Sequence, residues 1–107
     1  MKYSIFINPH SKNSFATQHA LNFIDALLSS DNEIISVFFY GYSVKYAFDY
    51  HQHWQAIAAK NVKLVACSTI AESHQYSDRN LVNYFKLAGL GQWIDAVFQS
   101  DKDIEFI

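Results

Sequence analysis

Residues 33–40 read Glu-Ile-Ile-Ser-Val-Phe-Phe-Tyr, and residues 62–66 read Val-Lys-Leu-Val-Ala. Both are short runs rich in β-branched and aromatic residues, and the first is typical of a strand buried on both faces of a parallel sheet. A similar run, Tyr3 to Ile7, ends at Asn8-Pro9, because proline cannot donate a ladder hydrogen bond. The last run is Ile104 to Ile107. These segments predict the strands of one sheet.

Helical patterns separate the predicted strands. The first follows a cap at Asn13 or Ser14, and its apolar stripe consists of Ala16, Ala20, Phe23, Ile24 and Leu27. Further helices are predicted over 44–59, in one or two pieces, from about Asn80 to Ala88, and around Trp93 to Phe98. A polar connection covers 68–78. The alternation predicts a single α/β domain over 1–107, a three-layer sandwich with a mostly parallel sheet of four to five strands and helices on both faces.

The composition of the chain excludes some classes of function and favours others. Charged residues make up 17% of the 107 residues, below the ~25% usual in soluble domains, and aromatic residues make up another 17%. We therefore expect another subunit to cover some apolar surface, in part through the eight rings between Phe38 and Trp54. A net charge of −2 without a basic stripe argues against direct nucleic-acid binding. One cysteine and a short N-terminal apolar run favour a cytoplasmic protein without membrane association.

Cys67 is the only thiol, and it stands where the third predicted strand ends. Loops beginning at Asn8, Tyr40 and Cys67 should meet at the carboxyl edge of the sheet, where ligands of parallel sheets gather. Thr69 and Glu72 match a capping box, so a helical turn starting after Cys67 would favour a thiolate. A reactive thiol and a small buried apolar residue both fit this position.

The sequence gives less support to a metal, nucleotide or flavin site. His10, His51, His53 and His74 have no metal-ligand spacing, so we expect structural or surface histidines and no metal, although His10 or His74 could assist Cys67. The loop 8–14 lacks the glycines of phosphate-binding loops, which argues against a nucleotide or flavin. We expect no cofactor.

The chain resembles the DsrE/DsrF family and, within it, the TusD-type sulfurtransferase subunits. The resemblance rests on Ser36-Val37-Phe38-Phe39-Tyr40, on the strand-end Cys67, on Gln18-His19-Ala20 and on residues 85–91, Phe-Lys-Leu-Ala-Gly-Leu-Gly. It covers almost the whole chain. The chain is shorter than typical members, chiefly between Tyr42 and Val62, and lacks the basic residues that often follow the cysteine.

The resemblance implies a sulfur relay. Cys67 would accept sulfane sulfur as a persulfide from a TusA-like donor and pass it to a TusE-like acceptor, towards 2-thiouridine in tRNA or in sulfur oxidation. TusB-like and TusC-like subunits, or self-association, would complete the assembly. The alternative is a non-catalytic subunit of such an assembly, in which Cys67 is only structural.

Overall fold

A computed structural model describes residues 1–76 and 79–107, which form one five-stranded sheet. The strands lie in the order β4-β3-β2-β1-β5, and all neighbouring pairs are parallel. Their bounds are β1 Lys2–Ile7, β2 Glu33–Phe39, β3 Lys63–Cys67, β4 Phe85–Ala88 and β5 Lys102–Phe106. The predicted α/β fold with a parallel sheet is therefore confirmed, and the sheet has its maximum expected number of strands.

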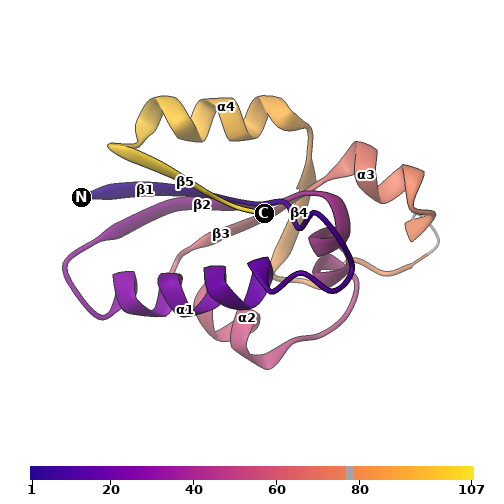
Figure 1. The fold of residues 1–107 in the computed structure, drawn as a ribbon, viewed down its shortest axis with the longest axis horizontal. Helices are drawn as coiled ribbons and strands as arrows, with labels where there is room; N and C mark the ends of the chain where they lie inside the picture. The colour runs from indigo at the N-terminus through magenta and orange to yellow at the C-terminus, as the bar shows by residue number, and fades with distance from the viewer. Residues whose placement is uncertain (77–78) are drawn as a thin grey trace.

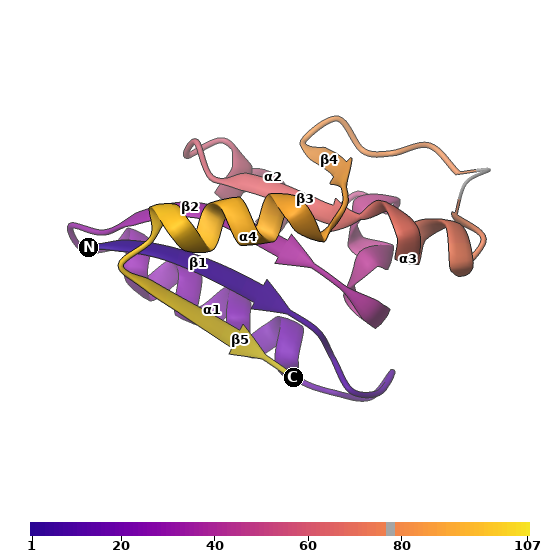
Figure 2. The ribbon, with the colours of Figure 1, turned by 90° about the horizontal axis from the view of Figure 1, so that it is seen from above.

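Helices cover both faces of the sheet (Figure 1). Helix α1 (Ala16–Leu28), the 3₁₀ helix η1 (Gly41–Ala47) and α2 (Gln52–Ala58) lie on one face, and α4 (Leu90–Gln99) lies on the other. The chain steps from β1 to β4 in one direction, and α4 then crosses back to β5 beside β1. Because parallel crossovers are right-handed, reversing the direction puts α4 on the opposite face. Figure 2 shows α4 lying across β1 and β2.

The two faces of the sheet carry separate aromatic contacts. On the α2 face, Phe39 meets Trp54 edge-to-face at 4.9 Å between ring centroids and Phe85 at 4.8 Å. On the α4 face, Phe6 meets Trp93 at 5.0 Å. Successive strand residues point to opposite faces, so the near-continuous apolar runs of the central strands fill both layers.

The predicted helix from Asn80 to Ala88 is wrong, because Phe85–Ala88 form the edge strand β4. The segment pairs in register with β3, with Phe85 opposite Leu64. The spacing of Leu81, Tyr84, Phe85 and Ala88 fits a helix, but so short a run is ambiguous, and the open edge of β3 decides it. The helix predicted around Trp93 to Phe98 is confirmed as α4, which begins directly after Gly89.

Other predictions made from short stretches of sequence agree better with the structure. The predicted helix over 44–59 forms two pieces, η1 and α2. The Ser14 hydroxyl accepts a hydrogen bond from the Ala16 amide at 3.0 Å, although Phe15 holds the N-cap position of α1. Within the predicted polar connection, α3 (Ser68–Ser73) is helical, while Ser77 and Asp78 lie outside the described residues.

The helices in 1–76 and 79–107 include none long and apolar enough to cross a membrane.

Candidate functional site

The three predicted loops meet at the carboxyl edge of the sheet. The hydroxyl of Ser43 in η1 donates to the carbonyl of Ile7 at the end of β1, at 2.9 Å. Gly41 has φ +59, and a Cβ there would lie 2.8 Å from Asn8 Oδ1, so the turn into η1 needs glycine. The rings of Tyr42 and His74 lie 6.2 Å apart, which brings the segment after α3 to the same edge.

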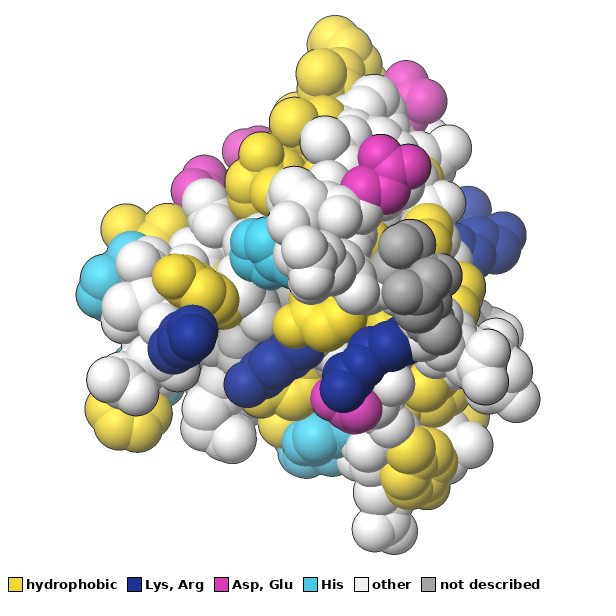
Figure 3. Space-filling model, turned by 90° about the vertical axis from the view of Figure 1, so that its right-hand side faces the viewer, with side chains coloured by type: hydrophobic (Ala, Val, Ile, Leu, Met, Phe, Trp, Pro, Cys, Tyr) yellow, Lys and Arg dark blue, Asp and Glu magenta, His cyan; other side chains and the backbone are white. Residues whose placement is uncertain are grey.

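This edge carries a mixed surface. Figure 3 views the molecule from this end, with dark blue Lys and Arg side chains among yellow hydrophobic ones. Arg79 Nη1 lies 3.7 Å from Asp49 Oδ1 in an exposed ion pair. Exposed pairs of this kind contribute little to stability.

Cys67 ends β3 and is the N-cap residue of α3. Its backbone position is as predicted, and a helix follows it directly. The helix begins at Ser68 rather than after Thr69, so Thr69 does not cap it in the manner expected from the sequence.

The thiol of Cys67 is buried. The residue is 2% exposed and belongs to the hydrophobic core cluster. Of the two possibilities that the sequence leaves open, a reactive thiol and a small buried apolar residue, the thiol is covered in the isolated chain, as the second requires. Cys67 lies at the junction of β3 and α3, and these two elements pack against each other, with Ala71 of α3 in the same core cluster.

The side chain of Cys67 lies on the α4 face of the sheet. Ala66 is in register with Phe39, which packs on Trp54 and so faces α2. Cys67, as the next residue in the strand, faces the opposite side. In 1–76 and 79–107, no hydrogen bond joins Cys67 to His10 or His74.

His51, the N-cap residue of α2, and His53 within the helix both have structural partners. His51 Nδ1 accepts a hydrogen bond from the Trp54 amide at 3.4 Å and caps the helix. His53 Nε2 lies 2.7 Å from Asp25 Oδ2. These are the structural roles expected from the sequence. Among the described residues, groups of three or more His, Cys, Asp or Glu suited to a metal ion are absent.

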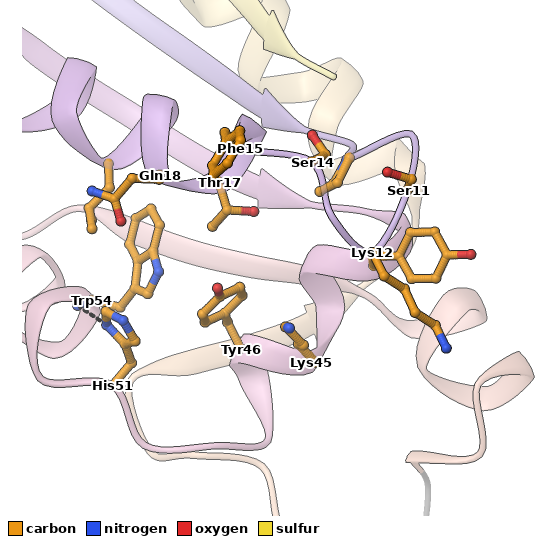
Figure 4. A pocket seen from close by; sticks show the side chains of 13 residues that line it. Ser11, Lys12, Ser14, Phe15, Thr17, Gln18, Lys45, Tyr46, His51 and Trp54 are labelled. Carbon is orange, nitrogen blue, oxygen red and sulfur yellow. Dashed lines mark hydrogen bonds between the residues drawn. The ribbon is translucent and has the colours of Figure 1, made fainter.

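His51 borders a cavity that sequence analysis missed. Burial, and to a smaller extent the charge of His53, lower the pKa of His51 from its usual 6.5. The cavity measures about 110 Å³ and lies between the loop after β1, the first turn of α1, η1 and the start of α2 (Figure 4). Its lining comes from segments far apart in the chain, so no sequence motif could reveal it.

The expected interface segment, Phe38 to Trp54, is only partly exposed. Phe38, Phe39 and Trp54 are core residues, while Tyr50 is 65% exposed. A different apolar surface is more prominent. One stripe of α4, formed by Leu90, Ile94 and Phe98, is exposed, with Phe98 at 84%. The spacing of four residues aligns these side chains on one face of the helix.

Comparison with known proteins gives the family. The model of the DsrE/DsrF-like family matches residues 1–106. The chain belongs to the DsrE/DsrF-like family.

The chain also has distant full-length relatives. It is 26% identical over 128 residues to a sulfurtransferase TusD homolog of Vibrio vulnificus, covering 99% of this chain and 98% of the relative. A TusD homolog of Aliivibrio fischeri is 27% identical, with 97% of each covered. Because these alignments are longer than the 107-residue chain, the relatives carry insertions, in agreement with the shorter length inferred above.

A solved structure shares the fold. The crystal structure of the ychN protein from E. coli superposes with a TM-score of 0.85, at 17% identity, over 99% of both chains. This likeness establishes the architecture of the sheet and helices and nothing about chemistry.

Proposed function

We propose that this chain is a sulfur-relay protein that carries sulfane sulfur as a persulfide on Cys67. The observation that carries the proposal is the position of the only thiol, at the carboxyl end of β3, in a full-length family member related to TusD homologs. Ligands and reactive groups of open parallel sheets gather at that edge.

The chemistry needs only thiols. The thiolate of Cys67 attacks the outer sulfur of a persulfide on a TusA-like donor, the donor's S–S bond breaks, and the donor cysteine leaves as a thiolate. Cys67 then bears the outer sulfur. In the second step a thiolate of a TusE-like acceptor attacks that sulfur, and Cys67 leaves as a thiolate. Two S–S bonds form and two break, so no external oxidant or reductant is required.

For this mechanism, the persulfide of a partner protein must reach the buried thiol of Cys67. At 2% exposure, Cys67 cannot meet a protein-bound persulfide unless the cover over it opens. Helix α3 has six residues and its packing includes η1. A helix this short has little stability of its own and depends on tertiary contacts. We propose that α3 moves when donor or acceptor docks.

The partners follow from the same proposal. TusB-like and TusC-like subunits, or further copies of this chain, would bind the exposed stripe of Leu90, Ile94 and Phe98 on α4. Figure 3 shows hydrophobic side chains at the top of the molecule, over α4. An exposed apolar patch of this kind marks an interaction surface. The sulfur would go towards 2-thiouridine in tRNA in a cytoplasmic relay.

The experiment is sulfur loading followed by intact-mass spectrometry. Wild-type protein incubated with a persulfidated TusA-like donor should gain one sulfur atom, and reduction should remove it. Cys67→Ala should gain none, while Ser68→Ala, which changes the neighbouring residue and keeps the thiol, should load like wild type. A competent donor that leaves wild-type mass unchanged would refute carriage by Cys67.

A second candidate is a non-catalytic subunit of a DsrE-family assembly. The burial of Cys67 favours it, because a sealed thiol behaves as a small apolar core residue. Iodoacetamide labelling separates the two functions. A carrier should label faster once its donor is bound, whereas a structural thiol should stay unlabelled until the chain unfolds.

A further inference from the structure

The cavity between α1, η1 and α2 contains a buried donor that lacks an acceptor. Trp54 is 0% exposed, and its indole Nε1 has no hydrogen-bond partner within 1–76 and 79–107. Figure 4 shows this nitrogen on the edge of the ring that points toward Tyr46, and both residues line the cavity. Buried polar groups are nearly always paired, so an unpaired indole N–H at a cavity wall calls for an acceptor there, either a water molecule or a bound ligand.

The surroundings favour an acceptor that carries negative charge. Lys12 and Lys45 line the cavity, and Lys45 Nζ lies 5.4 Å from the centre of the Tyr46 ring. Thr17 and Gln18, in the first turn of the 13-residue helix α1, line it too, at the end where backbone N–H groups and the helix dipole attract anions. Of the described residues that line the cavity, none is acidic.

The volume limits the size of the ligand. About 110 Å³ corresponds to roughly three or four water molecules at ~30 Å³ each. That space suits an anion of about four or five non-hydrogen atoms.

We infer that this cavity binds a small oxyanion, one oxygen of which accepts the Trp54 Nε1–H hydrogen bond while its charge faces Lys45. Phosphate, sulfate, thiosulfate and acetate share this chemistry. The site lies on the α2 face of the sheet, and Cys67 faces α4, so oxyanion binding is separate from sulfur carriage and does not depend on it.

The test uses the indole N–H resonances in ¹H–¹⁵N NMR spectra. The chain has two tryptophans, and Trp93 packs against Phe6 on the other face, so its signal is an internal control. Titration with sodium phosphate, sulfate, thiosulfate or acetate, at constant ionic strength set with chloride, should move the Trp54 signal saturably and leave that of Trp93 in place. The four arms identify which geometry of oxyanion fits.

Substitutions inside and outside the cavity test whether the anion binds there. Lys45→Gln should weaken binding about tenfold, as expected for loss of a charge-assisted hydrogen bond, and Lys12→Gln should have a smaller effect, because the Lys12 side chain points away from Trp54 (Figure 4). Lys60→Gln removes the same charge from an exposed position outside the cavity and should leave affinity unchanged, as should Cys67→Ala. Trp54→Phe should abolish binding measured by calorimetry.

Several results would overturn the inference. A Trp54 signal that does not respond to any of the four anions would show that the cavity takes no oxyanion. Equal weakening by Lys60→Gln and Lys45→Gln would show that binding reflects overall charge. Should Trp54→Phe fail to fold, the lysine variants still decide the matter.

Discussion

Cys67 lies opposite Ala88 in the parallel register between β3 and β4. The backbone that bears the thiol is therefore fixed by a strand on one side and continues directly into α3. Exposure of the sulfur must come from movement of its cover, because moving β3 itself would break the ladder. We expect α3, which begins at the next residue and has only six residues, to be the element whose movement gives access to Cys67.

Loosening α3 should speed labelling of Cys67. Ala71 is buried within α3, and Ala71→Gly should cost about 1 kcal/mol of helix stability, plus a small packing loss. If α3 opens alone, the rate of iodoacetamide labelling should rise about fivefold. Ala56→Gly makes the same change at an exposed position of α2 and should leave the rate unchanged. Equal acceleration in both variants would mean that labelling follows global unfolding.

Replacing Cys67 should affect stability according to the polarity of the new side chain. In a core position with 2% exposure, serine introduces a hydroxyl that needs a partner, which costs about 1–3 kcal/mol. Alanine loses only a small volume and should be milder. Urea unfolding of both variants measures the difference. A serine variant as stable as the alanine variant would indicate that the sulfur site is polar or hydrated, contrary to its place in the core cluster.

The central strands of the sheet were predictable because their apolar runs are typical of buried strands, as in Glu33–Phe39. The edge strand Phe85–Ala88 was not, because four residues fit a helix and a strand equally well until β3 offers an edge. The place of Cys67 could be derived from its strand, but its burial depends on the tertiary packing around the junction of β3 and α3. The oxyanion cavity depends on four separate segments meeting.

The apolar stripe on α4 should mediate association. Phe98→Ser removes its most exposed ring, at 84%, and should lower the average oligomer mass measured by light scattering after size-exclusion chromatography, without loss of helical content. Phe15→Ser is the matched control, since Phe15 is 72% exposed next to the first turn of α1. A wild-type chain that stays monomeric, or a Phe15 variant with the same effect, would contradict this assignment.

Acid should destabilise the fold through His51. Its lowered pKa, caused by burial and by His53, means that the unfolded chain binds a proton more readily than the folded chain. The contribution of His51 is therefore fully present above its ordinary value of 6.5 and is lost as the pH falls through the lowered folded-state pKa. Protonation also turns Nδ1 into a donor, so it can no longer accept from the Trp54 amide.

The variant His51→Asn isolates this effect. Asparagine is a good N-cap and can still accept from the Trp54 amide, but it does not titrate. Unfolding free energies of wild type and variant, measured in urea from pH 8 down to about pH 5, should run parallel above the usual histidine pKa of ~6.5 and diverge below it, with wild type losing more. Both proteins retain the His53–Asp25 pair, so its contribution to the unfolding free energy cancels when one curve is subtracted from the other. Curves that stay parallel across the whole range would show that His51 does not couple protonation to folding.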